Sequence, residues 1–207
     1  MLKRMAVVTP TKGERTLSTI LDQAACLATV VGLDGLSIGG LATAAGMSKS
    51  GVYAHFGSKQ ELQLATIERA REIFVAEVLR PALAAPKGIR RLEAACEQFL
   101  SYVERGVFPG GCFFSAAAVD VASWPGPVRD AIADHRTAWL VTLEQLACEA
   151  QVGGQMNPGL DPSQMAFELQ AVLAAANTSF ILLGDNLVFD RARHAVCERL
   201  RWSRVAV

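Results

Sequence analysis

Apolar residues recur every three or four positions along most of the chain, which is the spacing of one buried face of an α-helix. The first such stretch runs from Leu17 to Val31 and ends near Gly32. No stretch of useful length alternates apolar and polar residues, so the pattern does not indicate β-strands. The sequence therefore predicts an all-α protein.

Two short helices joined by a tight turn are predicted next. The first begins at Ser37, whose hydroxyl can accept an amide hydrogen bond from the first turn. Gly46 ends it, because glycine readily takes the positive φ angle of a sharp turn. Ser48 is placed to cap the second helix, whose only clear inward anchors are Val52 and Phe56. Most side chains of the second helix are therefore expected to be exposed.

These exposed side chains suit the major groove of DNA. Small residues allow close approach, hydroxyl groups reach phosphates or base edges, and lysine supplies positive charge. The second helix carries residues of all three kinds: Lys49, Ser50, Gly51, Tyr53 and His55. The layout is that of a helix-turn-helix; the alternative is a plain helical hairpin whose second helix is solvated.

The run GMSKSGVYAHFGSKQEL, residues 46–62, resembles the recognition-helix signature of TetR-type (TetR/AcrR) transcriptional regulators. That signature has a glycine turn, a Ser-Lys start, Tyr-x-His-Phe and then Ser-Lys-x-x-Leu. Many members have two histidines after the tyrosine, whereas here Ala54 precedes His55. The resemblance implies a DNA-binding domain at residues 1–58, with its motif at 37–56, and a helical effector-binding and dimerisation domain at 59–207. The candidate DNA contacts are Ser37, Thr43, Ser48, Lys49, Ser50, Gly51, Tyr53, His55 and Lys59.

The resemblance also implies a one-component regulator, usually a repressor, which needs neither catalysis nor a cofactor. Its expected partners are double-stranded operator DNA with an inverted repeat, a small-molecule effector and a second copy of the chain. Bulky side chains of the second domain favour an apolar or aromatic effector, although each could instead fill the core. The candidate effector contacts are Phe99, Tyr102, Cys112, Phe113, Phe114, Trp124, Trp139, Met165 and Phe167.

The last two predicted helices have a broad apolar surface with small residues, which let another helix approach closely. We expect two copies of the pair to form a four-helix dimer interface. Its candidate residues are Val172, Ala175, Ser179, Phe180, Ala192, Ala195, Arg199 and Trp202.

Helix boundaries in the second domain follow from caps and breaks. Ser58 and Glu61 form a predicted capping box that opens a helix running to Pro81. Lys59 lies in its first turn, where a DNA phosphate is a plausible partner. The inner face of this helix is predicted at Leu62, Ala65, Ile73 and Ala76. Further helices are expected near residues 89–105, 112–121, 128–151 and 161–184, and a last one is expected to be capped by Asp190.

Charge is balanced over the whole chain, with 20 Lys and Arg against 20 Asp and Glu, but it is unevenly distributed. Residues 1–60 hold six cations against three acids. The arm from Met1 to Lys12 is basic, and it either meets DNA or is a solvated tail. A basic amino end on an acidic body is expected if only the first segment contacts phosphate.

The cysteine pattern and the absence of a recognisable secretory signal favour a cytoplasmic protein. The five cysteines have no C-x-x-C spacing and are expected to be reduced. The longest apolar tract, residues 171–184, is shorter than the ~20 residues that a membrane span needs, so no membrane span is predicted.

The sequence contains three other chemical signals. Residues 35–39 match the G-x-S-x-G pattern of serine hydrolases, but no strand is predicted before Ser37. His194 and Cys197 share a helix face, which supplies only two metal ligands. Cys112 lies at a helix start, where the dipole favours the thiolate, so a redox-sensing or electrophile-sensing regulator is one alternative function. A small cytosolic hydrolase or a helical adaptor is the alternative from another class.

Overall fold

The computed structural model describes residues 12–205 of the chain. Residues 1–11, which make up nearly all of the predicted basic arm, lie outside the described residues. The all-α prediction is confirmed: the described residues form helices, and their only bridge of β type is an isolated one between Met156 and Arg204.

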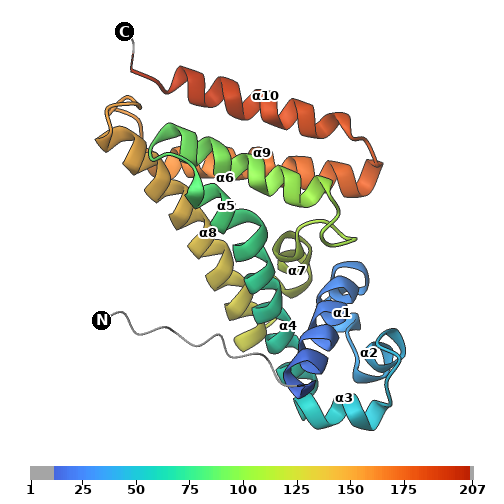
Figure 1. Cartoon of the computed structure of the whole chain (residues 1–207). Coiled ribbons are helices and arrows are strands. Elements are labelled where there is room, and N and C mark those ends of the chain that lie inside the picture. The colour runs from blue at the N-terminus through green and yellow to red at the C-terminus, as the bar shows by residue number, and fades with distance from the viewer. Residues whose placement is uncertain (1–11, 206–207) are drawn as a thin grey trace, which may run out of the picture.

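The first three helices form a compact unit at one end of the molecule, called the head here (Figure 1). They are α1 (Lys12–Gly35), α2 (Ile38–Ala44) and α3 (Lys49–Phe56). The predicted caps are present, because Ser37 Oγ accepts from Gly40 N at 3.0 Å and Ser48 Oγ accepts from Gly51 N at 3.1 Å. Gly46 has φ = 64°, as the predicted sharp turn requires.

The remaining helices form the body. They are α4 (Lys59–Phe74), the π-helical segment η1 (Val75–Leu79), α5 (Arg80–Ala84), α6 (Ile89–Glu104), α7 (Phe113–Val121), α8 (Pro127–Val152), α9 (Pro162–Leu183) and α10 (Leu187–Trp202). Helices α9 and α10 lie at the end opposite the head, α8 runs diagonally down the body, and α7 lies between α6 and α1 (Figure 1).

Two hydrophobic cores correspond to the head and the body. The head core is small and includes Ile20, Leu41, Val52 and Phe56. The body core is larger and takes side chains from α1 and α4 onwards. Helix α1 contributes to both cores, as does α4, whose Leu62 lies in the head core and whose later residues lie in the body core. These two helices therefore join the head to the body.

The long helix after the head differs from the prediction in its end and in its inner face. It does not stop at Pro81, because the wider π turn before it, in which Arg80 N–H bonds to Val75 C=O, accommodates the missing proline N–H. The predicted inner residue Ala76 is exposed, whereas Phe74 and Val78 are buried. The buried face is therefore set by neighbouring helices and by the π turn.

Two predicted caps also differ. Ser58 Oγ accepts from Glu61 N at 3.1 Å, but Ser58 N–H donates to Phe56 C=O instead of to the Glu61 carboxylate. The last helix begins at Leu187, whose N–H donates to the Asp185 carboxylate at 2.9 Å, so Asp190 is not its cap. Asp185 provides the earlier cap.

Two described helices are long and apolar enough, by length and composition, to cross a membrane. They are Thr16–Gly35 and Pro162–Leu183, with mean hydropathies of 1.4 and 1.5. The first packs against α4 and α7, and the second packs against α8 and α10. Core helices of soluble proteins pass the same test, so this finding is weak evidence for a membrane span.

Candidate DNA-reading surface and effector cavity

Helix α3 presents a polar surface on only two buried anchors. Val52 and Phe56 are buried, whereas Lys49, Ser50 and Tyr53 are exposed, Tyr53 to 58%. Ser48, Ala54 and His55 are exposed as well, and Gly51 is partly buried. A Cβ at Gly51 would lie 3.1 Å from Ser48 Oγ, so glycine leaves room for the cap. The structure thus brings the predicted contacts on α3 together on one accessible helix.

The other predicted DNA contacts, in α2 and at the start of α4, already have partners within the chain. Ser37 caps α2, and Thr43 Oγ1 donates to Gly39 C=O at 3.1 Å. Lys59 Nζ donates to Asp34 C=O at 2.6 Å and to the Asp34 carboxylate at 2.8 Å. In this conformation Lys59 therefore ties the start of α4 to the end of α1, and its contact with DNA phosphate stays a prediction.

The end of α1 is held by side chains of the body. Its helical geometry breaks at Gly32, with φ = 76° and ψ = 163°, which leaves the next amide without its helical partner. Leu33 N–H donates to the Asp120 carboxylate of α7 at 3.1 Å, and Leu33 C=O accepts from Gln63 Nε2 at 2.7 Å. Nearby, Gly110 N–H donates to Thr29 Oγ1 at 3.1 Å. Movement of α4 or α7 would therefore act directly on the head.

A cavity of about 330 Å³ lies in the body between α4, the π segment and α8. Its apolar wall consists of Phe74, Val75, Leu79, Ala138 and Trp139. Its polar lining residues are Arg71, Asp134, His135 and Thr142. π-Helical turns often occur at functional sites, and here the turn supplies two lining residues. A mostly apolar cavity with a few polar groups suits a small organic ligand.

His135 forms part of the cavity wall in its neutral form. Its ring stacks on Phe114, with ring centroids 3.3 Å apart, and meets Phe74 edge-on at 4.9 Å. Burial, followed by the nearby Arg71 charge, lowers the pKa of His135 to about 3. The imidazole therefore carries no charge near neutral pH.

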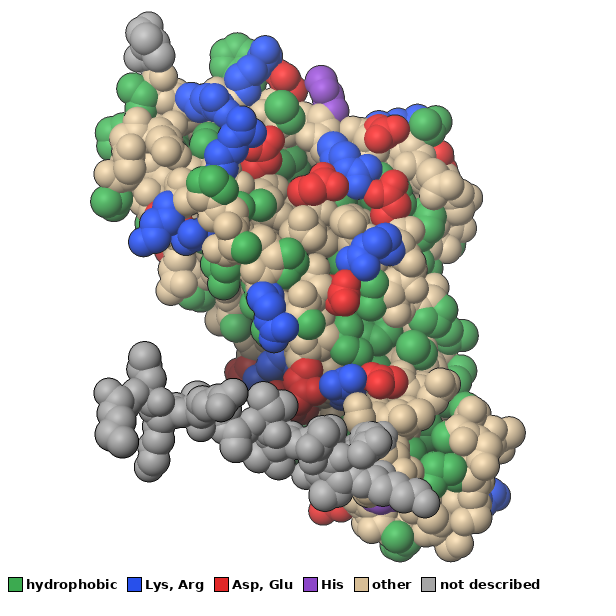
Figure 2. Space-filling view, viewed as in Figure 1, with side chains coloured by type: hydrophobic (Ala, Val, Ile, Leu, Met, Phe, Trp, Pro, Cys, Tyr) green, Lys and Arg blue, Asp and Glu red, His purple; other side chains and the backbone are tan. Residues whose placement is uncertain are grey.

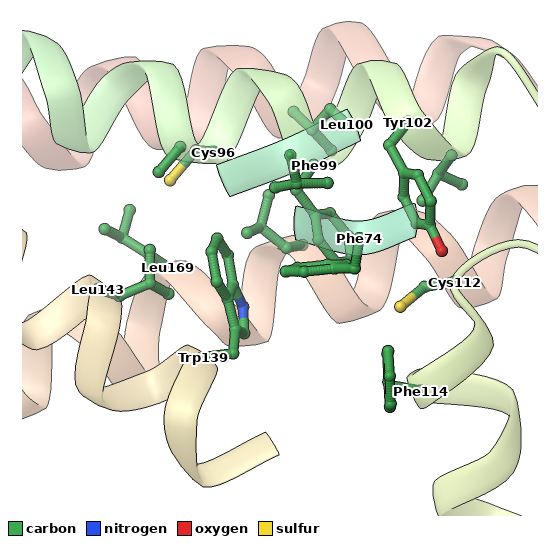
Figure 3. Close-up of a cluster of buried hydrophobic side chains, with 14 of the residues drawn as sticks. Phe74, Cys96, Phe99, Leu100, Tyr102, Cys112, Phe114, Trp139, Leu143 and Leu169 are labelled. Carbon is green, nitrogen blue, oxygen red and sulfur yellow. The ribbon is translucent and has the colours of Figure 1, made fainter. Parts of the chain in front are cut away.

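A second, smaller space, called the inner space here, shares Phe74, His135 and Trp139 with the first cavity, which is called the outer cavity. Four predicted effector contacts line this inner space: Phe99, Cys112, Phe114 and Trp139. Trp139 Nε1–H donates to Gln170 Oε1 at 2.6 Å, which fixes the indole between the two spaces. Figure 3 shows Trp139 directed toward Phe74, with the Tyr102 hydroxyl turned toward Cys112.

The other predicted effector contacts lie elsewhere. Tyr102, Phe113 and Met165 are buried in the body core without lining either space, and Trp124 is partly buried outside both. Phe167 is 65% exposed on α9 and lines neither of the two spaces. The sequence pattern could not distinguish a residue facing the cavity from one facing solvent, because α9 is apolar on several sides.

The prediction missed the residues that line most of the outer cavity. Arg71 and Phe74 come from α4, and Asp134 and His135 come from α8. The available signal was the spacing of Asp134, Ala138 and Thr142, which places all three on one face of α8. The role of this face is visible only in the tertiary structure, where α4 packs against α8.

The environment of Cys112 is the opposite of the one predicted for a reactive thiol. Its side chain is only 3% exposed, and burial raises the pKa of the thiol above its ordinary value despite local hydrogen bonds. Its backbone N–H donates to Asn177 Oδ1 of α9 at 2.8 Å. Cys112 therefore packs the start of α7 against α9, and the redox alternative receives no support.

The remaining chemical signals also have structural roles. Ser37 follows the end of α1 rather than a strand, so the geometry of a hydrolase nucleophile is not present there. Among the described residues, no group of three or more His, Cys, Asp or Glu side chains could hold a metal ion. His194 and Cys197 thus remain the two-ligand pair noted in the sequence.

A shallow groove of about 310 Å³ lies between α9 and α10 and contains several predicted dimer residues. The groove is lined by Val172, Ala175, Ala176, Ser179, Val188, Arg191, Ala192 and Ala195. Of the other predicted residues, Trp202 is 79% exposed, Phe180 packs against Phe189 with ring centroids 4.8 Å apart, and Arg199 pairs with Glu168. Phe180 and Arg199 therefore have partners within the chain.

Most charged side chains of the body lie beside opposite charges on the face shown in Figure 2. Among the ion pairs of the body, Arg193 pairs with Glu97 at 3.0 Å and with Glu104 at 2.5 Å. Paired side chains of this kind differ from the unpaired donors expected at a DNA backbone.

We expect the buried neutral His135 to reduce stability in acid. An unfolded chain binds a proton at this residue below pH ~6.5, whereas the folded protein resists protonation until about pH 3. Proton binding thus favours the unfolded chain, so stability should fall as the pH drops through this window, by up to about 1.4 kcal/mol per pH unit. Urea unfolding of the wild type and His135→Gln at pH 7, 6 and 5 measures the difference; parallel pH profiles would contradict it.

The sequence matches two protein families in successive segments. Residues 20–66 match the family described as bacterial regulatory proteins, tetR family, and residues 88–196 match the tetracyclin repressor-like, C-terminal domain. No curated protein matches the chain in sequence. The two matched segments correspond to most of the head and most of the body.

Solved structures share the whole fold. A TetR transcriptional regulator from Chloroflexus aurantiacus J-10-FL has a TM-score of 0.86 and 26% identity, covering 94% of this chain and 99% of that one. A TetR-family regulator from Cytophaga hutchinsonii has a TM-score of 0.80 at 18% identity, covering 96% and 100%. AibR, solved in complex with isovaleryl coenzyme A and operator DNA, has a TM-score of 0.72 at 24% identity, covering 88% and 97%.

Proposed function

Because this chain belongs to the TetR family of bacterial transcription regulators, we propose that it is a repressor released from its operator by a small apolar or aromatic effector. The observation that carries the proposal is the pairing of an exposed polar α3 with an aromatic cavity in the same chain. AibR, whose fold is similar, was crystallised with both an effector and operator DNA. This role requires no catalysis. The proposed site of action is the cytoplasm, because the chromosome lies there.

The two proposed domains correspond to the two hydrophobic cores. Residues 1–58 form the DNA-binding domain and residues 59–207 form the effector-binding and dimerisation domain, with α1 and α4 shared between the two cores. Helix α3 enters the major groove, with Lys49, Ser50 and Tyr53 as its principal contacts. A homodimer formed through α9 and α10 supplies the second reading head, so the operator is an inverted repeat.

Release from DNA follows from the position of the cavity. The effector binds against Phe74 on α4, while the first turn of α4 is tied to α1 through Lys59 and Asp34. When the effector shifts α4, the tie to α1 moves the head as well. The conformer that binds the effector more tightly therefore has a different distance between the two heads of the dimer. DNA affinity falls by the ratio of effector affinities for the two conformers.

Selection of bound fragments from the source genome with purified protein tests the proposed function. We expect enrichment of an inverted repeat, with binding that weakens steeply as salt rises, because phosphate contacts release counterions. A helical adaptor or a hydrolase would enrich no sequence, so the absence of an enriched inverted repeat would overturn the proposal.

Two lysines, Lys49 of α3 and Lys59 at the start of α4, should affect DNA binding differently. Lys49 is exposed on α3, whereas Lys59 is engaged with Asp34. We expect Lys49→Met to lower the slope of log affinity against log salt by about one, and Lys59→Met to leave this slope nearly unchanged while lowering stability. Fluorescence anisotropy at several salt concentrations measures both slopes.

Tyr53→Ala serves as a control for sequence reading, because it should change the preference between operator variants without changing the salt slope. If Lys59→Met lowered the slope of log affinity against log salt as much as Lys49→Met does, this would show that Lys59 leaves Asp34 and contacts phosphate.

A further inference from the structure

The wall of the outer cavity contains a buried hydrogen-bond donor with no acceptor. Arg71 Nε is shielded from solvent and makes no hydrogen bond with any of the described residues. The nearest ion-pair partner is the Glu68 carboxylate, 3.6 Å from this nitrogen, which is too far for a hydrogen bond. By contrast, Arg69 on the same helix bonds to Asp22 at 2.7 Å and to Glu72 at 2.8 Å. Buried donors usually have partners, and an acceptor group on a ligand in the cavity would provide one for Arg71 Nε.

The surroundings of this donor define the body of a ligand. Phe74 and Trp139 contact each other edge-on, with ring centroids 5.3 Å apart, and Val75, Leu79 and Ala138 complete the apolar wall. The volume of about 330 Å³ is roughly twice that of an engineered cavity that binds benzene, at about 150 Å³. The cavity therefore suits a body of one or two rings, or a branched aliphatic body of that size.

The charges at the cavity favour a negative group on the ligand. The Arg71 side chain is 40% exposed with its Nε buried, whereas the side chain of Glu68 is 61% exposed and Asp134 is an exposed residue. His135, the remaining titratable lining group, is neutral near pH 7. The positive charge of Arg71 acts at the cavity wall, because after burial it is the second cause that lowers the pKa of His135.

We propose that the effector is a carboxylic acid with an apolar body, whose carboxylate accepts hydrogen bonds from Arg71 while its body packs against Phe74 and Trp139. The inference rests on the proposed function, because it names the chemistry of the ligand that the cavity takes. Guanidinium and carboxylate groups form charge-assisted, often bidentate hydrogen bonds, which make this pairing selective. Asp134 is the one lining carboxylate that opposes such a ligand.

Three probes with the same two-ring body and different charge test the inference: 2-naphthoate, 2-naphthamide and 2-naphthylmethylammonium. Isothermal titration calorimetry of the full chain at pH 7 should show 2-naphthoate binding about tenfold or more tighter than either other probe. Arg71→Gln should remove this preference, whereas Arg71→Lys, which keeps the charge and loses the planar fork, should retain part of it. Circular dichroism checks that each variant is folded.

Two carboxylate variants give the matched controls. Asp134→Asn should tighten 2-naphthoate severalfold, because it removes the opposing charge from the lining. Glu68→Gln should leave 2-naphthoate binding unchanged or tighter, because it only frees Arg71. Tighter binding of the ammonium probe, weakened by Asp134→Asn, would instead establish a cation site and overturn the inference, as would equal binding of all three probes or binding of none.

The outcome is separable from that of the proposed function. Wild-type protein that selects an inverted repeat but shows no preference for 2-naphthoate would retain the repressor role and lose the carboxylate inference. Protein that prefers 2-naphthoate in an Arg71-dependent way but selects no DNA would retain the inference and lose the repressor role.

Discussion

Placing carboxylates in the groove between α9 and α10 should yield folded monomers whose specific DNA binding is at least about 100-fold weaker. Ala175 and Ala195 both line this groove, so Ala175→Glu with Ala195→Glu sets like charges against each other across the proposed two-fold axis. A single α3 contacts only a few base pairs, and two heads must be about 34 to 36 Å apart to enter successive major grooves. Loss of the dimer therefore removes half of the contacts and their fixed spacing.

Sedimentation velocity measures the dimer, circular dichroism measures helix content, and anisotropy measures binding to the selected operator. Ala84→Glu is a matched control, because Ala84 is an exposed alanine outside the groove. We expect this control to remain a dimer with normal operator binding. If the double variant sedimented as a dimer, the interface would have to lie elsewhere on the chain.

Substituting Gly110 should disrupt the junction between the head and the body. A Cβ added at Gly110 would lie 2.0 Å from the Thr29 carbonyl oxygen and 2.7 Å from its carbonyl carbon. Both are backbone atoms of α1, so no side-chain rotation relieves the contact and α1 itself must move. We expect Gly110→Ala to cost about 3 kcal/mol or more in the free energy of unfolding, and to weaken operator binding because α1 supports α3.

Urea unfolding monitored by circular dichroism measures this cost, and operator binding is measured at a temperature where the variant is folded. Gly106→Ala in the preceding turn is the control: its φ is +63°, but a Cβ there meets nothing within 4 Å. It should cost only the strain of the left-handed conformation, about 1 to 2 kcal/mol. Equal losses for the two variants would show that the contact with Thr29 is not tight.

Features set by neighbours in sequence were predictable without the tertiary structure. The caps at Ser37 and Ser48 and the positive φ at Gly46 depend on bonds spanning three or four residues, and all three are present. The same local chemistry exposes the polar face of α3, because two buried anchors four residues apart leave its other sides free. The family signature lies within this stretch, which is why the class of protein was also predictable.

Features that depend on which helix faces meet were decided by the tertiary structure. Phe167 and Phe74 are both aromatic residues on helices of the body, yet Phe167 is exposed and Phe74 lines the cavity. The reason is that α8 packs over Phe74, whereas no described helix covers Phe167. Arg71 and Asp134 reach the same cavity from helices far apart in sequence. Lys59 finds Asp34, and Gly110 finds Thr29, across 25 and 81 residues of chain.

Burial likewise determined the chemistry of individual groups. At Cys112 the start of a helix favours the thiolate, but desolvation by the surrounding core outweighs this effect and raises the pKa of the thiol. At His135 the same desolvation keeps the ring neutral within the cavity wall. The sequence by itself determined most of the helices, the caps at Ser37 and Ser48 and the exposed side of α3, since these depend on contacts within a turn or two. The cavity, its charge and the junction between head and body required the tertiary structure, because they depend on the relative positions of helices that no local pattern specifies.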